Sequence, residues 1–106
     1  MTCTRAVLLF LVVAAGATVA ATAAGAADVE RGEVMAKRWC AACHVVAAGQ
    51  ARASTQAPPF QEIAIKPGFD AARLALYLLL PHPRMPDMNM SRAEAADLAA
   101  YIASQR

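Results

Sequence analysis

The chain has 106 residues, of which 58% are hydrophobic, and its formal net charge at neutral pH is +2. This length allows one small domain at most. A nearly balanced charge without a basic stripe disfavours nucleic acid as a partner. No residue pattern pairs a nucleophile with a base, or two acids with each other, as a hydrolase requires.

Residues 1–26 are typical of a secretory signal peptide. A basic start at Arg5 precedes an apolar run, and no charged residue appears again before Asp28. An A-x-A stretch ending at Ala26 predicts cleavage there or one residue later, with export to the periplasm. The alternative is an uncleaved anchor, because the uncharged run is just long enough to cross a bilayer. The small residues in its second half favour cleavage, which leaves residues 27–106 as the mature domain.

Asp28 is the predicted N-cap of the first helix, and acidic residues follow in the early turns, near the positive end of the helix dipole. Small and apolar residues recur at three-to-four spacing as far as Cys40. Gly32 lies within this helix, where glycine is unfavourable relative to alanine. We therefore expect Gly32 to allow another helix to approach closely.

The first helix leads into the sequence Cys40-Ala41-Ala42-Cys43-His44, which is the attachment sequence of a c-type haem. Two thiols on one helical turn can face the same way and bind the vinyl groups along one porphyrin edge. The next side chain, His44, can then point at the iron as the proximal ligand. The motif thus predicts one covalent haem c, attached through Cys40 and Cys43.

Two other chemistries could use this motif. A redox dithiol would normally lie beside a βαβ pattern, and no strand-like alternation follows here. A zinc site would need a further ligand, and His82 is the only other histidine. Cleavage would also remove Cys3, which leaves a close pair of cysteines and not a framework of disulfides. A domain this small benefits from a covalent staple, so we expect the haem-free protein to be poorly folded.

Residues 45–62 have no sustained periodicity and include Pro58-Pro59. They predict a loop, which either straps one face of the haem or only connects two helices. Phe60, Ile63 and Ile65 are expected to contact the core from this loop and a short helical turn.

Asp70 is the predicted N-cap of a helix that runs from Ala71 to about Leu80. This helix is apolar around most of its circumference, which is typical of a buried helix, here one that lies against a large cofactor. Pro81 and Pro83 then end it.

The loop that follows contains His82, Met85 and Met88, and Met90 lies just beyond it. Haem c that transfers electrons usually has a thioether sulfur as its sixth ligand. Met85 precedes a proline in a proline-rich loop that can hold a side chain still, so it is the preferred ligand, with Met88 as the alternative. His82 is expected to be a hydrogen-bonded loop residue and not a ligand.

Ser91 and Glu94 match a capping box at the start of the last helix, with Met90 available as a staple to Ala95. The last helix is expected to run to about Ala103. Its inner stripe is predicted to consist of Ala95, Leu98, Ala99 and Ile102, with Tyr101 beside them.

In their order along the chain, these features resemble the class I mono-haem cytochromes c. The resemblance covers residues 28–105 and rests on the haem motif, Gly32 before it, Pro58-Pro59-Phe60, Met85-Pro86 and the last helix. It implies an all-α fold of about three main helices, with irregular loops wrapped around one covalent haem. It also implies that the first and last helices cross near Gly32 and Tyr101.

The resemblance further implies that a proline carbonyl, Pro58 or else Pro59, accepts the second ring N–H of His44 and orients the imidazole. Tyr77 stands where the family often places a hydroxyl or aromatic group near the methionine sulfur, and plain core packing would explain it equally well. The loop before Pro58 lacks the glycine-rich sequence common in relatives.

The predicted function is that of a periplasmic single-haem electron carrier, which cycles between Fe(II) and Fe(III) and transforms no substrate. Its partners would be redox donor and acceptor proteins, and it would meet a membrane only if residues 1–26 stayed attached. An alternative is the electron-accepting subunit of a dehydrogenase or oxidase. A haem sensor or weak peroxidase would require Met85 to leave the iron easily.

Overall fold

The computed structural model describes residues 25–53 and 57–106. Within this part of the chain, the elements are α1 (Val29–Met35), the π-helix η1 (Ala36–Cys40), α2 (Phe60–Ala64), α3 (Ala71–Leu78) and α4 (Arg92–Ala103). These described ranges contain no strand, only an isolated bridge between His82 and Met85. The predicted all-α fold is therefore confirmed. The predicted signal peptide, residues 1–26, lies outside the described residues except for its last two.

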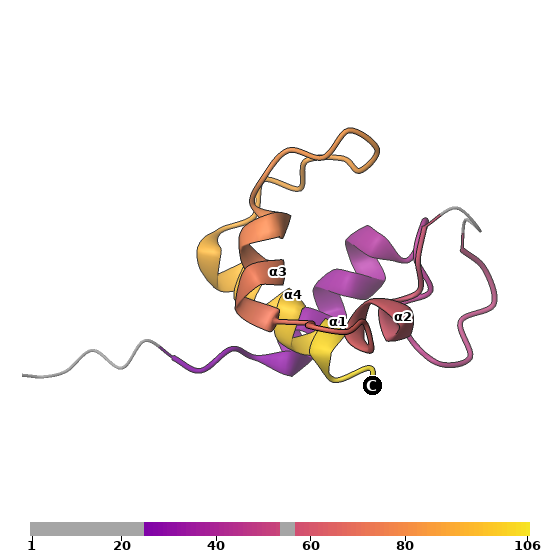
Figure 1. Ribbon diagram of the computed structural model, residues 1–106. Helices are drawn as coiled ribbons and strands as arrows, with labels where there is room; N and C mark the ends of the chain where they lie inside the picture. The colour runs from indigo at the N-terminus through magenta and orange to yellow at the C-terminus, as the bar shows by residue number, and fades with distance from the viewer. Residues whose placement is uncertain (1–24, 54–56) are drawn as a thin grey trace, which may run out of the picture.

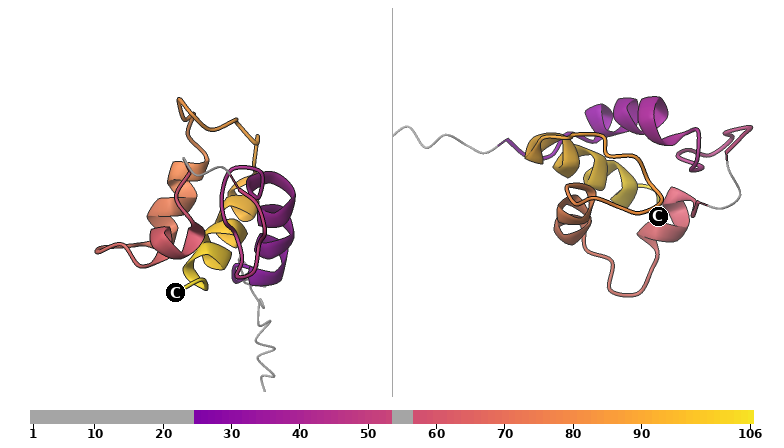
Figure 2. Two further views of the ribbon diagram at one scale, coloured as in Figure 1. Left: turned by 90° about the vertical axis from the view of Figure 1, so that its right-hand side faces the viewer. Right: turned by 90° about the horizontal axis from the view of Figure 1, so that it is seen from above.

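The last helix, α4, is the centre of the fold, because α1, α2 and α3 all pack against it (Figure 1). The loop between α3 and α4 rises from α3 and returns to the start of α4 beside α1 (Figure 2). None of the helices in these described stretches is long and apolar enough to cross a bilayer.

The helices α1 and α4 cross at Gly32, which is buried. A Cβ atom on Gly32 would lie 2.7 Å from the Cβ of Tyr101 and closer still to the backbone carbonyl oxygen of Asp97. Real Cβ atoms do not approach other atoms so closely, so only glycine fits at this position. The predicted close approach near Gly32 and Tyr101 is confirmed.

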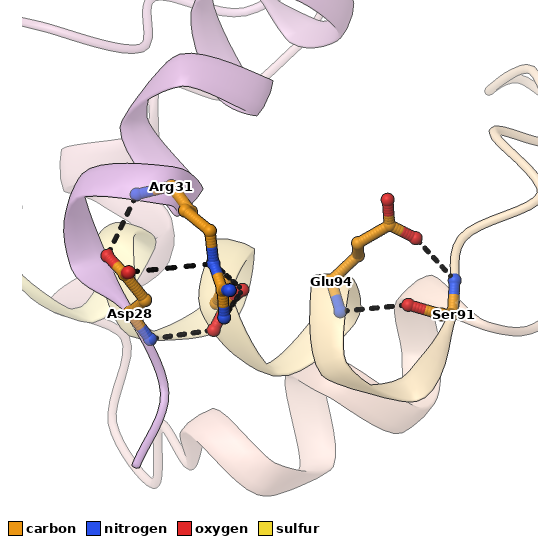
Figure 3. A network of polar contacts seen from close by, with 5 residues as sticks. Asp28, Arg31, Ser91 and Glu94 are labelled. Atoms are coloured by element: carbon orange, nitrogen blue, oxygen red, sulfur yellow. Dashed lines mark hydrogen bonds and ion pairs between the residues drawn. The ribbon is translucent and has the colours of Figure 1, made fainter. Parts of the chain in front are cut away.

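A buried carboxylate ties the start of α1 to α4. Asp97 is only 3% exposed, and its carboxylate accepts a hydrogen bond from the backbone N–H of Asp28 at 2.6 Å. It also accepts one from Arg31 Nε at 2.9 Å and forms an ion pair with Arg31 Nη2 at 2.8 Å. Arg31 contacts Asp28 as well, as Figure 3 shows. Because a buried charge is tolerated only when it is paired and hydrogen-bonded, this cluster fixes the crossing.

The predicted helix caps are present. The side chains of Asp28 and Asp70 accept hydrogen bonds from the backbone N–H groups three residues later, at 3.0 and 2.6 Å. At α4, the N–H of Glu94 donates to Ser91 Oγ at 3.2 Å and the N–H of Ser91 donates to Glu94 Oε2 at 2.8 Å (Figure 3). This capping box lowers the pKa of Glu94, chiefly through the hydrogen bond from the Ser91 backbone. Met90 packs against the core, as a staple should.

The hydrophobic core joins α4 to η1, to α2 and to the loop after the haem motif. Its buried members are Ala36, Val46, Phe60, Ala64, Leu98, Tyr101 and Ile102. The Tyr101 hydroxyl donates a hydrogen bond to the carbonyl of Val46 at 2.8 Å, and its ring meets the Phe60 ring edge-on at 6.3 Å. Burial, with a smaller contribution from Glu33, raises the pKa of Tyr101. The core thus holds the loop after the haem motif directly against α4.

Several predicted boundaries need correction. The first helix does not stay α-helical up to Cys40, because its last five residues form a π-helix, in which the N–H of Ala41 bonds to the carbonyl of Ala36 at 3.1 Å. The third helix ends at Leu78, and not near Leu80, because the next two N–H groups bond three residues back and tighten the turn. The expected core contact of Ile65 is wrong: it is 63% exposed, since it lies just beyond the end of α2.

Candidate functional site

The Cys-x-x-Cys-His sequence forms a tight turn at the end of η1. The N–H groups of Cys43 and His44 both donate to the carbonyl of Cys40, at 3.1 and 2.8 Å. Both cysteines are free; Cys40 is half-buried and Cys43 is exposed. Burial, with a smaller contribution from Cys43, raises the pKa of Cys40 to about 11. Cys40 is therefore a thiol at neutral pH, close to a second thiol on the same turn.

The imidazole of His44 is held by the loop that precedes α2. Its Nδ1 lies 2.7 Å from the carbonyl oxygen of Pro58. A carbonyl oxygen can only accept, so Nδ1 carries the hydrogen and Nε2 keeps its lone pair. The ring also packs against Phe60, with 5.4 Å between ring centroids. This arrangement leaves Nε2 as the ring atom that can bind a metal ion.

Gln50, which no motif or periodicity in the sequence predicted, also contacts this turn. Its side-chain nitrogen lies 3.0 Å from the carbonyl oxygen of Ala41 and 2.8 Å from that of His44. The only signal in the sequence is that Gln50 is the one large polar residue in residues 45–51. Asp97 was missed too, because it lies beside the apolar stripe of α4 and its partner Arg31 is distant in sequence.

The helix α3 presents an apolar side that the rest of the described chain does not cover. Leu74 and Leu78 pack against the core, whereas Leu76 is 60% exposed and Tyr77 is 56% exposed. The prediction that this helix is buried against a large cofactor stays a prediction, since α3 packs on α4 through its other side and the protein leaves this side uncovered. The position of Tyr77 near the methionine sulfur stays a prediction, and so does its alternative, core packing.

The loop after α3 makes a tight turn around the candidate sixth ligand. Met85 forms the isolated antiparallel bridge with His82, whose ring lies edge-on to the Tyr77 ring at 3.9 Å. Met85, Met88 and Met90 are all half-buried, but only Met90 packs against the core. Met85 and Met88 therefore have no packing role in the core. The bridge and the ring contact connect Met85 to α3 through His82.

One expectation about this loop is wrong. His82 was expected to be a hydrogen-bonded loop residue, yet its Nε2 is buried and has no hydrogen-bond partner among the described residues. The ring contact with Tyr77 holds the imidazole in its place.

The predicted site residues thus gather in two groups. Cys40, Cys43, His44 and Pro58 come together at the turn after η1, and Tyr77 and Met85 come together through His82 at the end of α3. The family model for cytochrome c matches residues 29–106, from the start of α1 to the last residue. This chain belongs to the cytochrome c family.

One curated relative supports the same conclusion for this cytochrome c. Cytochrome c-552 of Bradyrhizobium diazoefficiens is 50% identical over 102 residues, which cover 96% of this chain and 94% of the relative. No solved structure matches the chain significantly. The resemblance to class I mono-haem cytochromes c is confirmed, and with it a covalently attached haem c that contains iron and an electron-transfer role.

The residues of this cytochrome c fit such a group. Two free thiols lie on one turn beside an imidazole whose Nε2 can bind iron. Leu76 on α3 and Leu80 just after its end are both exposed, and together they suit a large flat ligand that is mostly hydrocarbon.

Proposed function

We propose that this cytochrome c is an exported single-haem electron carrier, in which Cys40 and Cys43 attach the haem while His44 and Met85 bind the iron. The observation that supports this proposal most is the 2.7 Å contact between His44 Nδ1 and the Pro58 carbonyl. It orients the ring, selects the tautomer and increases the electron density at Nε2.

The support for Met85 comes from the loop. The bridge to His82 and the ring contact of His82 with Tyr77 connect the backbone of Met85 to α3 through His82. A thioether ligand stabilises Fe(II) relative to Fe(III), which raises the reduction potential. If His44 and Met85 both held the iron, no position would stay open for a substrate, and this would favour a carrier over an enzyme.

When bound, haem c supplies a one-electron redox couple. The residues of the chain hold the haem and control its surroundings. The turn after η1 holds the two thiols, Pro58 accepts a hydrogen bond from His44 Nδ1, and the exposed apolar side of α3 would exclude water once the haem covers it. Residues 1–26 would direct export to the periplasm and then be removed. There the partners would be proteins that donate and accept single electrons.

The experiment is to express the full chain in a host with haem-attachment machinery, purify the periplasmic product, and measure its intact mass, its pyridine haemochrome spectrum and its reductive titration. We expect a chain beginning at residue 27 or 28 with one haem, and one reversible one-electron step. The Cys40→Ala, Cys43→Ala double variant is the control and should contain no covalent haem.

The outcomes separate this function from its alternatives. A colourless mature chain would overturn the proposal, and a product that begins at residue 1 would overturn signal cleavage. Stable co-purification with a large dehydrogenase or oxidase would favour the subunit role. Rapid binding of CO to the resting reduced protein would favour a sensor or peroxidase.

A further inference from the structure

The side chain of Gln50 forms four hydrogen bonds in the loop after the haem motif. Its Oε1 accepts from the N–H of Val46 at 2.9 Å. Its Nε2 lies 3.0, 2.8 and 2.7 Å from the carbonyl oxygens of Ala41, His44 and Arg52. The side-chain oxygen of Gln50 thus faces a backbone N–H, and its side-chain nitrogen faces backbone carbonyls. These partners determine the orientation of the side-chain amide. Because the NH2 group carries two hydrogens, the three carbonyls share them.

Two of these carbonyls belong to the attachment turn. The last carbonyls of a helix have no partner within the helix, and η1 ends at Cys40, so the carbonyls of Ala41 and His44 lie at and beyond this end. Gln50 satisfies both from outside the turn. Without the Gln50 amide, the carbonyls of Ala41 and His44 would form hydrogen bonds with water instead. The backbone of His44 would then lose a direct hydrogen bond to the protein.

The other contacts of Gln50 connect this turn to the core. Val46, whose N–H reaches Gln50, is buried, and its carbonyl accepts the hydrogen bond from Tyr101. Gly49 has a φ of +78°, and the backbone N–H of Gln50 bonds to the carbonyl of Ala47 at 3.3 Å. This reversal of the chain returns the Gln50 side chain to the turn.

We propose that Gln50 is a positioning residue for the iron ligand His44. Pro58 orients the imidazole ring, and Gln50 holds the backbone from which that ring extends, so the ligand is fixed at both ends. Gln50 acts through His44 and does not itself bind the haem. The inference rests on the proposed function, because it takes His44 to be the proximal ligand.

The test compares the haem-loaded wild type with Gln50→Met and Gln50→Glu. Methionine has a similar length and removes all four hydrogen bonds, whereas glutamate keeps an acceptor for the N–H of Val46 and removes the donors. The matched control is Gln61→Met, at an exposed position on α2. The readouts are the paramagnetically shifted NMR signals of the His44 ring in the ferric protein and the reduction potential.

Both Gln50 variants are expected to move the ring signals of His44 and the reduction potential, while Gln61→Met leaves them at the wild-type values. A residue that only stabilised the loop would lower the unfolding temperature without moving these signals. Variants of Gln50 with wild-type ring signals and potential would overturn the proposal.

A measurement on the reduced wild type decides the matter if the variants fail to mature. The side-chain amide protons of Gln50 should exchange with solvent about tenfold more slowly than those of Gln61, the factor expected for a net hydrogen-bond energy near the top of its usual range. Equal exchange rates would overturn the positioning role while leaving the carrier function intact. A wild type without His-ligated haem would instead overturn both.

Discussion

At the scale of single residues, the chemistry of the site depends on where one hydrogen lies. The Pro58 carbonyl, 2.7 Å from His44 Nδ1, keeps the hydrogen on that nitrogen and leaves the lone pair on Nε2. The same carbonyl limits rotation of the ring, so one backbone oxygen sets both which ring nitrogen carries the hydrogen and the direction of the ligand.

The choice between two methionines is tested at this scale. Met85→Ala should abolish the far-red charge-transfer band of methionine-ligated ferric haem and lower the reduction potential, because the iron loses its thioether. Met88→Ala is the matched control and should keep the band. Absorption spectra and redox titrations of the two holoproteins measure both effects. The opposite order of losses would assign the ligand to Met88.

At the scale of elements, the crossing of α1 and α4 depends on a missing side chain. Gly32 lets the backbone of α4 come so close that a Cβ would overlap Tyr101 and the carbonyl of Asp97. The carboxylate of Asp97 then binds Asp28 and Arg31 at the start of α1. Gly32 thus permits the close approach of the two helices. The hydrogen bonds and ion pairs of Asp97 with Asp28 and Arg31 then stabilise it.

Substitution Gly32→Ala should destabilise the holoprotein by about 1–3 kcal/mol, because the two helices must move apart to admit a methyl group. Val34→Ala, at an exposed position on the same helix, should change the stability by no more than about 0.5 kcal/mol. Denaturant unfolding followed by the haem absorbance gives both values. Equal effects of the two substitutions would contradict the close approach.

The capping box of α4 predicts a pH dependence. The Ser91 backbone hydrogen bond lowers the pKa of Glu94 in the folded state, so its contribution to stability is complete above the ordinary pKa of glutamate and is lost as the pH falls through the lowered value. Glu94→Gln keeps an acceptor but does not titrate, so stability should fall less steeply with acid. Unfolding curves between neutral and acidic pH measure the slope, and an unchanged slope would contradict this role of Glu94.

At the scale of the whole molecule, the protein alone does not cover all of its apolar side chains. All of the other α-helices pack against α4, yet Leu76 and Tyr77 on α3 are exposed, and so is Leu80 just beyond its end. Apolar side chains exposed together on one helix contribute little to folding until a ligand covers them. The haem is thus expected to complete the core as well as to transfer electrons.

Protein expressed without haem attachment, as the Cys40→Ala, Cys43→Ala double variant, should therefore be poorly folded. We expect it to lack the cooperative thermal transition of the holoprotein and to bind a hydrophobic dye such as ANS. Circular dichroism during heating and dye fluorescence measure this. A sharp, native-like transition in the haem-free variant would contradict the dependence of the fold on its cofactor.

Patterns among residues close together in the sequence were enough to predict the helices that position the site. The caps at Asp28, Asp70 and Ser91, and the haem motif itself, rely on groups a few residues apart, so they can be recognised without knowing the fold. Gly32 was predictable as well, because an interior glycine has few other uses in a helix.

Tertiary structure alone decided the contacts between residues distant in sequence. Whether Pro58 or Pro59 faces His44, why Asp97 is buried, and why Gln50 turns back onto the attachment turn all depend on how loops and helices come together. Hydrophobic periodicity contains no information about such polar partners, because it records which side of a helix is apolar and not what lies opposite. The chain therefore determined its cofactor chemistry locally, whereas packing around α4 determined how the ligands are held.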